Sequence, residues 1–68
     1  MKGYYVIPQT DDPIEFTGKN SRKRAIAKML ELNEQGDTDV FVQRFDDDNP
    51  DGFFAGEEII TLKNYKEN

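Results

Sequence analysis

The sequence of 68 residues contains no cysteine, no histidine and no tryptophan. Without cysteine there is neither a disulfide framework nor a thiolate metal site, and without histidine the commonest transition-metal ligand is missing. The same two absences remove the most frequent nucleophiles and general bases, and the only serine, Ser21, falls at a predicted helix start with no base in view. We therefore expect a protein that is not an enzyme and that holds no cofactor.

Long hydrophobic runs are also missing. The first apolar run, residues 4–7, stops at Pro8, which is shorter than the core of a signal peptide and far shorter than the roughly 20 residues of a membrane span. The absence of cysteine agrees with a reducing compartment. We expect a cytoplasmic protein without membrane contact.

Hydrophobic residues make up 35% of the chain and charged residues 34%, but aromatic residues reach 12%, which is too many for a disordered chain. A chain of this length forms one small domain and buries only about 60% of the surface that unfolding exposes. We predict a single folded domain over residues 1–68, with a frayed C-terminal end at residues 63–68.

Hydrophobic periodicity predicts four strands and one helix. Alternating or β-branched runs indicate strands at residues 3–7, 14–17, 40–45 and 58–62, and the polar residues between the first two predict a hairpin. A helix is predicted over residues 21–35. The order ββαββ indicates a small two-layer α+β domain, with an antiparallel or mixed sheet and one helix packed on one face. The order of the strands in the sheet stays open.

The predicted helix has recognisable ends and one apolar side. Asn20 or Ser21 is suited to cap its first turn with a side-chain oxygen, and Gly36 stands where a left-handed residue ends many helices. The apolar stripe comprises Ala25, Ile26, Met29, Leu30 and Leu32.

One helix covers only one face of a sheet, yet the strands carry apolar groups on both faces. Tyr4 and Val6 alternate with Tyr5 and Ile7, for example, so both sets need cover. The C-terminal segment or a partner must cover the second face, and a homodimer through an uncovered face is one possibility.

Charge is strongly segregated along the chain, whose formal net charge is −5. Between Met29 and Ile60 the only basic residue is Arg44, and the acidic residues culminate in Asp46-Asp47-Asp48. This density is typical of a surface that binds a basic partner, or of a mimic of nucleic-acid charge. The leading interpretation is a regulatory protein-interaction module that presents Asp37, Asp39, Asp46, Asp47, Asp48, Asp51, Glu57 and Glu58 to another protein.

A basic block at residues 19–28 supports a second interpretation. It contains Lys19, Arg22, Lys23, Arg24 and Lys28 and no acid. Cations at a helix N-terminus oppose the helix dipole, so they call for a counter-charge, either inside the protein or on a phosphate backbone. The alternative function is therefore nucleic-acid binding, although the negative net charge opposes it.

A third interpretation is calcium binding by the segment from Asp47 to Glu58. Asp47, Asn49, Asp51 and Glu58 match the ligand spacing of an EF-hand loop, with Gly52 at the sixth position. The preceding segment is predicted as a strand rather than the helix that an EF-hand needs. A solvated acidic β-turn is the simpler explanation, so no metal site is assigned here.

Overall fold

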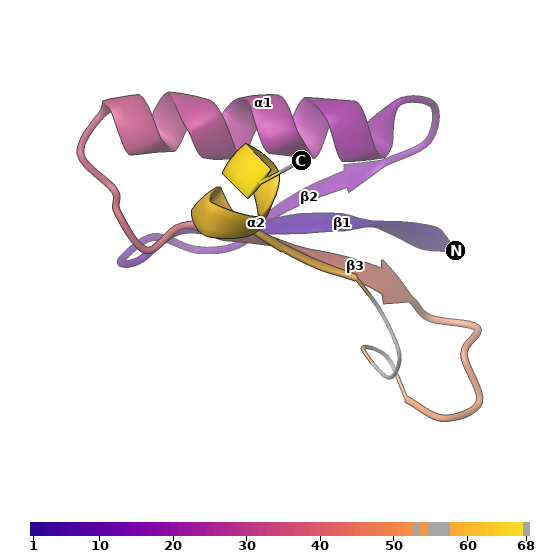
Figure 1. Ribbon diagram of the computed structural model, residues 1–68. Coiled ribbons are helices and arrows are strands. Elements are labelled where there is room, and N and C mark those ends of the chain that lie inside the picture. The colour runs from indigo at the N-terminus through magenta and orange to yellow at the C-terminus, as the bar shows by residue number, and fades with distance from the viewer. Residues whose placement is uncertain (53, 55–57, 68) are drawn as a thin grey trace.

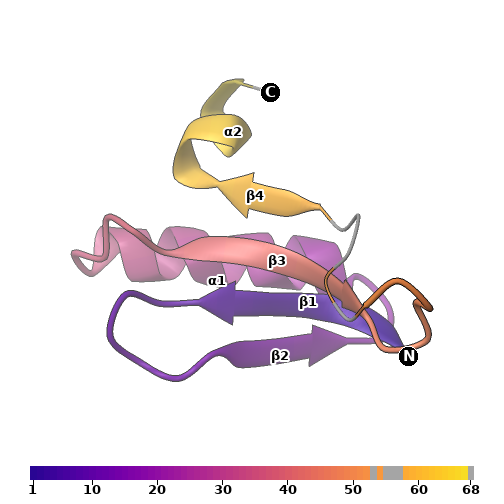
Figure 2. The ribbon, with the colours of Figure 1, turned by 90° about the horizontal axis from the view of Figure 1, so that it is seen from below.

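The chain folds into one antiparallel sheet with strand order β2-β1-β3-β4 and a long helix across one face (Figures 1 and 2). This computed structural model describes residues 1–52, 54 and 58–67. The elements in chain order are β1 (Lys2–Ile7), β2 (Ile14–Thr17), α1 (Ser21–Glu34), β3 (Phe41–Asp46), β4 (Ile59–Thr61) and α2 (Leu62–Glu67). The predicted α+β class and the predicted helix across one face are confirmed.

The predicted hairpin of β1 and β2 is present, and the new information is that β1 lies between β2 and β3. Val6 is opposite Ile14 on one side and opposite Val42 on the other. The chain therefore leaves β2, passes through α1 and returns to the far side of β1 as β3. This arrangement is a split β-α-β unit. The adjacent strand β4 then pairs with β3, with Ile60 opposite Val42.

Helix α1 buries its apolar stripe against the three strands β2, β1 and β3. Ala25 and Met29 are fully buried, and the neighbouring stripe residues pack at the edge of the core. The core cluster of buried residues comprises Val6, Ala25, Met29, Val40, Val42 and Ile60. Burying a valine, isoleucine or methionine side chain of this cluster contributes about 1.5–3 kcal/mol to the free energy of folding. This burial is the main favourable contribution to stability in a domain without disulfide bonds.

The two ends of α1 differ in how well the sequence predicts them. Gly36 has φ of 111°, its N–H donates to the carbonyl of Asn33 at 3.0 Å, and the N–H of Asp37 donates to the carbonyl of Leu32 at 3.1 Å. These two bonds form a Schellman motif, as the glycine predicts. The predicted side-chain cap is wrong for Asn20, which adopts a left-handed conformation with φ of 63° and makes no side-chain capping bond.

The C-terminal segment also differs from the prediction. Residues 63–68 are expected to fray and Leu62 to end the last strand, but Leu62–Glu67 form the short helix α2, which packs against β4 at the edge of the sheet (Figure 2). The N–H of Asn64 donates to Thr61 Oγ1 at 3.0 Å, so a threonine caps this helix. No helix in the described ranges is long and apolar enough to cross a membrane.

Candidate functional site

The strand register assigns every sheet residue to one of two faces. Because opposite residues in antiparallel strands share a face, the residues opposite Val6 lie on the α1 side, and their immediate neighbours lie on the other side. We call this second side the open face. The strands place on it Gly3, Tyr5, Ile7, Glu15, Thr17, Phe41, Gln43, Phe45, Ile59 and Thr61.

Aromatic side chains dominate the open face. The ring of Phe45 is only 1% exposed and stacks on Tyr5, with 4.6 Å between centroids. A Cβ atom at Gly3 would lie only 2.8 Å from the ring of Phe45. Glycine at this position therefore leaves room for the ring to pack against the sheet. Phe54, from the connection between β3 and β4, contacts Tyr5 edge to face at 6.3 Å. A hollow of about 320 Å³ lies between Tyr5, Ile7, Pro13 and Phe54.

The basic block lies on the other side of the sheet, at the start of α1. Arg22 donates from Nε and a terminal nitrogen to the two carboxylate oxygens of Glu58, at 3.2 and 3.1 Å. The hydroxyl of Tyr4 donates to the same carboxylate at 3.4 Å. Hydrogen bonds from Arg22 lower the pKa of Glu58, and the same contact raises the pKa of Arg22. Glu58 thus supplies the tertiary counter-charge that the helix start requires.

Two further members of the basic block have partners within the chain. Arg24 donates to the carbonyl oxygens of Thr17 and Lys19, and its guanidinium lies 5.8 Å from the centroid of the Phe16 ring. Lys28 pairs with Glu31 at 2.7 Å on the same helix. In the described part of the chain, Arg22, Arg24 and Lys28 of the predicted nucleic-acid surface therefore make contacts within the protein.

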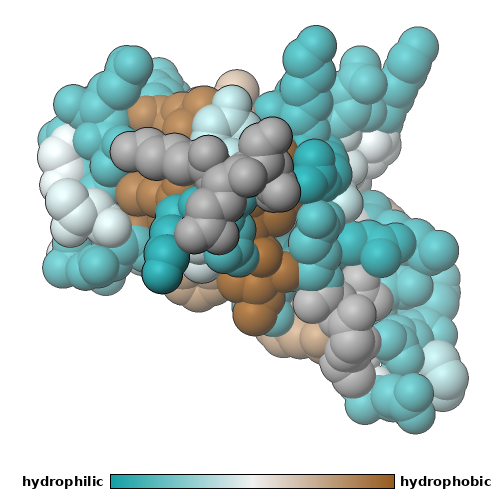
Figure 3. Space-filling model, viewed as in Figure 1, coloured by the Kyte–Doolittle hydropathy of each residue, from teal (hydrophilic) through white to brown (hydrophobic). Residues whose placement is uncertain are grey.

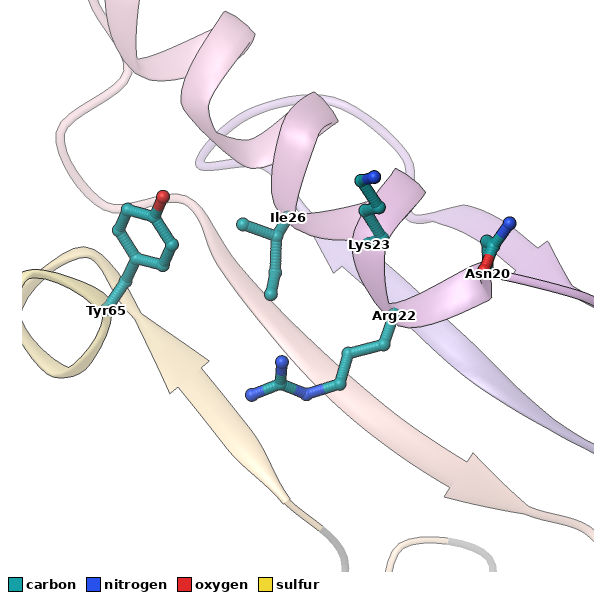
Figure 4. Close-up of a pocket in the computed structure, with 5 residues that line it drawn as sticks. All are labelled: Asn20, Arg22, Lys23, Ile26 and Tyr65. Carbon is teal, nitrogen blue, oxygen red and sulfur yellow. The ribbon is translucent and has the colours of Figure 1, made fainter. Parts of the chain in front are cut away.

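A shallow groove of about 390 Å³ separates the start of α1 from α2. It is lined by Asn20, Arg22, Lys23, Ile26 and Tyr65 (Figure 4). Arg22 extends across it towards β4, whereas Lys23 is directed away from the sheet. Because the guanidinium is held by Glu58, this groove is a boundary between two elements rather than a preformed anion site.

The acidic loop, residues 46–51, lies at the opposite end of the molecule from the connection between α1 and β3 (Figure 1). The carboxylates of Asp46, Asp47 and Asp48 offer oxygen atoms within 4.8 Å of one another. The Met1 ammonium pairs with Asp47 and, at 2.8 Å, with Asp48, while Lys2 lies 4.0 Å from Asp46. Within the described ranges, the acidic loop thus pairs with the first two residues and not with the basic block.

These contacts change the ionisation of both partners. Hydrogen bonds to Asp47 and then Asp48 raise the pKa of the Met1 ammonium to about 10. The hydrogen bond from this ammonium lowers the pKa of Asp48. Both groups are exposed, so solvent screens much of the attraction.

The predicted acidic surface is divided between separate places. Asp37 and Asp39 precede β3, whereas the acidic loop follows it, and a strand of this length spans about 20 Å. Asp37 also accepts a hydrogen bond from the N–H of Gln9 at 2.9 Å, which ties the two loops at that end. Glu58 belongs to the α1 side, and Glu57 lies outside the described residues. The acidic residues therefore form two clusters at the two ends of the sheet.

The calcium interpretation is not supported by the arrangement of its predicted ligands. Glu58, the residue expected at the twelfth loop position, directs its carboxylate to Arg22. Asn49 Oδ1 accepts the N–H of Asp51 at 2.9 Å, as in an ordinary Asx-turn, and the incoming element is strand β3. The turn explanation therefore accounts for the part of this segment that the structure describes.

Two features of the site have no signal in the sequence pattern. The first is the Met1 ammonium, which reaches carboxylates more than 40 residues away because β1 and β3 are adjacent and antiparallel. The second is Arg24, which sequence reasoning assigns to a phosphate backbone but which bonds the chain's own carbonyl groups. Both contacts depend on tertiary structure.

Together these features define a small α+β domain with a basic helical layer on one side of its sheet and an aromatic face flanked by acidic clusters on the other. Comparison with protein-family models, curated proteins and solved structures found no match to this chain. The functional argument therefore depends on the chemistry of its surfaces.

Proposed function

We propose that this protein is a non-enzymatic interaction domain that binds a basic protein partner through its acidic loop. The observation that carries the proposal is the separation of the two charged regions. Arg22 and Lys28 of the basic block pair with Glu58 and Glu31, and among the described residues no ion pair joins the acidic loop to the basic block. Among the described residues, the Met1 ammonium and Lys2 are the ion-pair partners of the loop carboxylates Asp46, Asp47 and Asp48.

Electrostatic repulsion within the acidic loop supplies the physical reason for binding. Three of its carboxylates offer oxygen atoms within 4.8 Å of one another, and the Met1 ammonium and Lys2 offset only part of the loop's negative charge. A partner with lysine or arginine side chains relieves the repulsion and is steered towards the loop by the surrounding negative potential. A mimic of nucleic-acid charge would bind basic proteins by the same means, so it is included in this proposal.

The test uses a synthetic 14-residue peptide with lysine and leucine side chains on opposite sides of a helix, and a counterpart with glutamate in place of lysine. We expect the lysine peptide to bind, with affinity falling about tenfold as salt rises from about 50 to about 300 mM, and the glutamate peptide not to bind. Isothermal titration calorimetry measures both.

A pair of charge-matched variants locates the binding surface. Asp48→Asn with Asp51→Asn should weaken binding about five- to tenfold, because two attractive pairs are worth about 1 kcal/mol together. Glu31→Gln with Glu34→Gln changes the net charge equally on α1 and should leave affinity within about twofold. Equal effects of the two variants, or binding of the glutamate peptide, would overturn the proposal. Binding of DNA or RNA at low salt in place of the lysine peptide would favour the basic block.

A further inference from the structure

The open face is a docking candidate because apolar groups remain accessible on it. Ile59 is 50% exposed and Phe54 is 42% exposed, and the hollow between Tyr5 and Pro13 lies on the same side. Figure 3 views the sheet from its α2 edge and shows hydrophobic surface next to α1 and, below it, at the level of the sheet. Apolar area of this kind, bordered by polar groups, is typical of an interaction site.

The charge around the open face is mostly negative, although the Met1 ammonium and Lys2 balance part of it at the acidic loop. The strands place one acid, Glu15, and no base on this face, and the bases of the basic block are on α1 except Lys19, which precedes it. One end of the face is bordered by the acidic loop. The other end carries Asp11 and Asp12 in the connection between β1 and β2, with Asp39 just before β3. The apolar residues of the open face thus lie between two groups of acidic residues, which are separated by the length of β3.

We infer that the open face binds an amphipathic basic helix of about 14 residues, with apolar side chains on the sheet and lysine or arginine near both of its ends. This inference rests on the proposed function and names the surface and the form of the partner. The length follows from the sheet itself, since α1 has 14 residues and covers the opposite face along the same direction. At 1.5 Å per residue such a helix is about 21 Å long, close to the span of β3.

The choice of a helix follows from the surface that is available. A peptide on the face of a sheet cannot use the hydrogen bonds that an edge offers to an added strand, so an element with satisfied backbone groups fits best. Helices pack on sheets through an apolar stripe, which would complete a three-layer arrangement. A second copy of this chain is a poorer occupant, because its acidic ends would meet those of the first copy.

The test compares three peptides of 14 residues: the lysine and leucine peptide above, a scrambled peptide of the same composition without an apolar stripe, and the glutamate counterpart. We expect the amphipathic basic peptide to bind at least about tenfold more tightly than the scrambled one, since only it buries leucine side chains. Amide signals of Tyr5, Gln43 and Ile59 should shift in its presence, and those of Ala27 and Glu31 should not.

Two matched variants give the second readout. Ile59→Lys places a positive charge on the open face and should weaken binding about tenfold, whereas Ala27→Lys adds the same charge on the exposed side of α1 and should change affinity less than twofold. Gln43→Lys tests the same face if Ile59→Lys does not fold, with amide signal dispersion as the check of folding.

The outcomes separate this inference from the proposed function. Equal binding of the amphipathic and scrambled peptides, or shifts confined to the acidic loop, overturns the open-face inference and leaves the proposed function standing. Absence of binding by every basic peptide overturns both. Dimerisation of the free protein with shifts on the open face identifies a second copy as the occupant and also overturns the inference.

Discussion

Arg24 illustrates how one side chain can stabilise a connection that lacks the usual cap. Asn20 supplies a main-chain carbonyl to the first helical turn, accepting from the N–H of Arg24 at 2.9 Å, but its side chain does not cap the helix. The guanidinium of Arg24 reaches back to the carbonyls of Thr17 and Lys19 and lies over Phe16. It therefore fixes the turn between β2 and α1 from the helix side.

Replacing Arg24 with alanine should lower the free energy of unfolding by about 1–2 kcal/mol, because charge-assisted hydrogen bonds and a cation–π contact are lost together. Lys23→Ala removes an exposed cation directed away from the sheet and should change stability by less than about 0.5 kcal/mol. Urea unfolding followed by circular dichroism measures both. Equal losses would show that Arg24 acts only through its charge.

At the scale of single residues, the sequence predicts the sign of the charge on each surface but not which residues form ion pairs. The crowding of cations at the start of α1 correctly indicates a need for counter-charge, and Glu58 meets it for Arg22. The identity of that acid is not predictable from local sequence, since 36 positions separate the two residues. The acidic residues separate into two clusters in space because Asp37 and Asp39 precede β3 and the acidic loop follows it.

The secondary-structure elements were largely predictable because their signals are local. Period-two alternation located β2, the apolar stripe located α1, and Gly36 located its end within about one residue. Strand order was not predictable, because placing β1 between β2 and β3 depends on long-range packing of α1. The short helix α2 was missed because residues 62–67 have no strong apolar period, and Thr61 was assigned to the preceding strand alone.

The ion pair between Arg22 and Glu58 links β4 to α1 and gives a pH dependence of stability. The pKa of Glu58 is lowered in the folded protein, so the folded state holds this proton less tightly than the unfolded chain. The contribution is complete above the ordinary value of 4.5 and is lost as pH falls through the lower folded pKa. Its size should stay below about 1 kcal/mol, because both side chains are about half exposed.

The variant Glu58→Gln should therefore be less stable than the natural protein near pH 6, and the difference should shrink as the pH falls below 4.5 and through the lowered pKa of Glu58 in the folded state. Urea unfolding at several pH values provides the comparison. Glu34→Gln removes an exposed carboxylate for which the described residues offer no ion pair, and it serves as the control. A difference that does not change with pH would contradict the assignment.

Across the whole molecule, charge is separated by the sheet. Cations of the basic block lie over one face, and the other face combines aromatic side chains with ends that are rich in acidic residues. At neutral pH the net charge of −5 should keep the free protein monomeric, because two open faces repel each other at both ends.

Near pH 4.5, where the net charge vanishes, we expect reversible association through the open face. Light scattering coupled to gel filtration should show a rising mass as the pH is lowered from 7. Ile59→Lys should reduce this rise more than Ala27→Lys does, since only the first substitution charges the open face. Identical behaviour of the two variants would place the association elsewhere.

The central position of β1 has a consequence for synthesis on the ribosome. β1 and β2 are available to pair once residue 17 has emerged, but the other edge of β1 waits for β3, which ends at Asp46. At about 5–20 residues per second, this edge stays open for roughly 1.5 to 6 seconds. During that interval the nascent hairpin offers unsatisfied backbone groups to any neighbouring chain, so crowding of translating ribosomes should favour domain-swapped dimers of this protein.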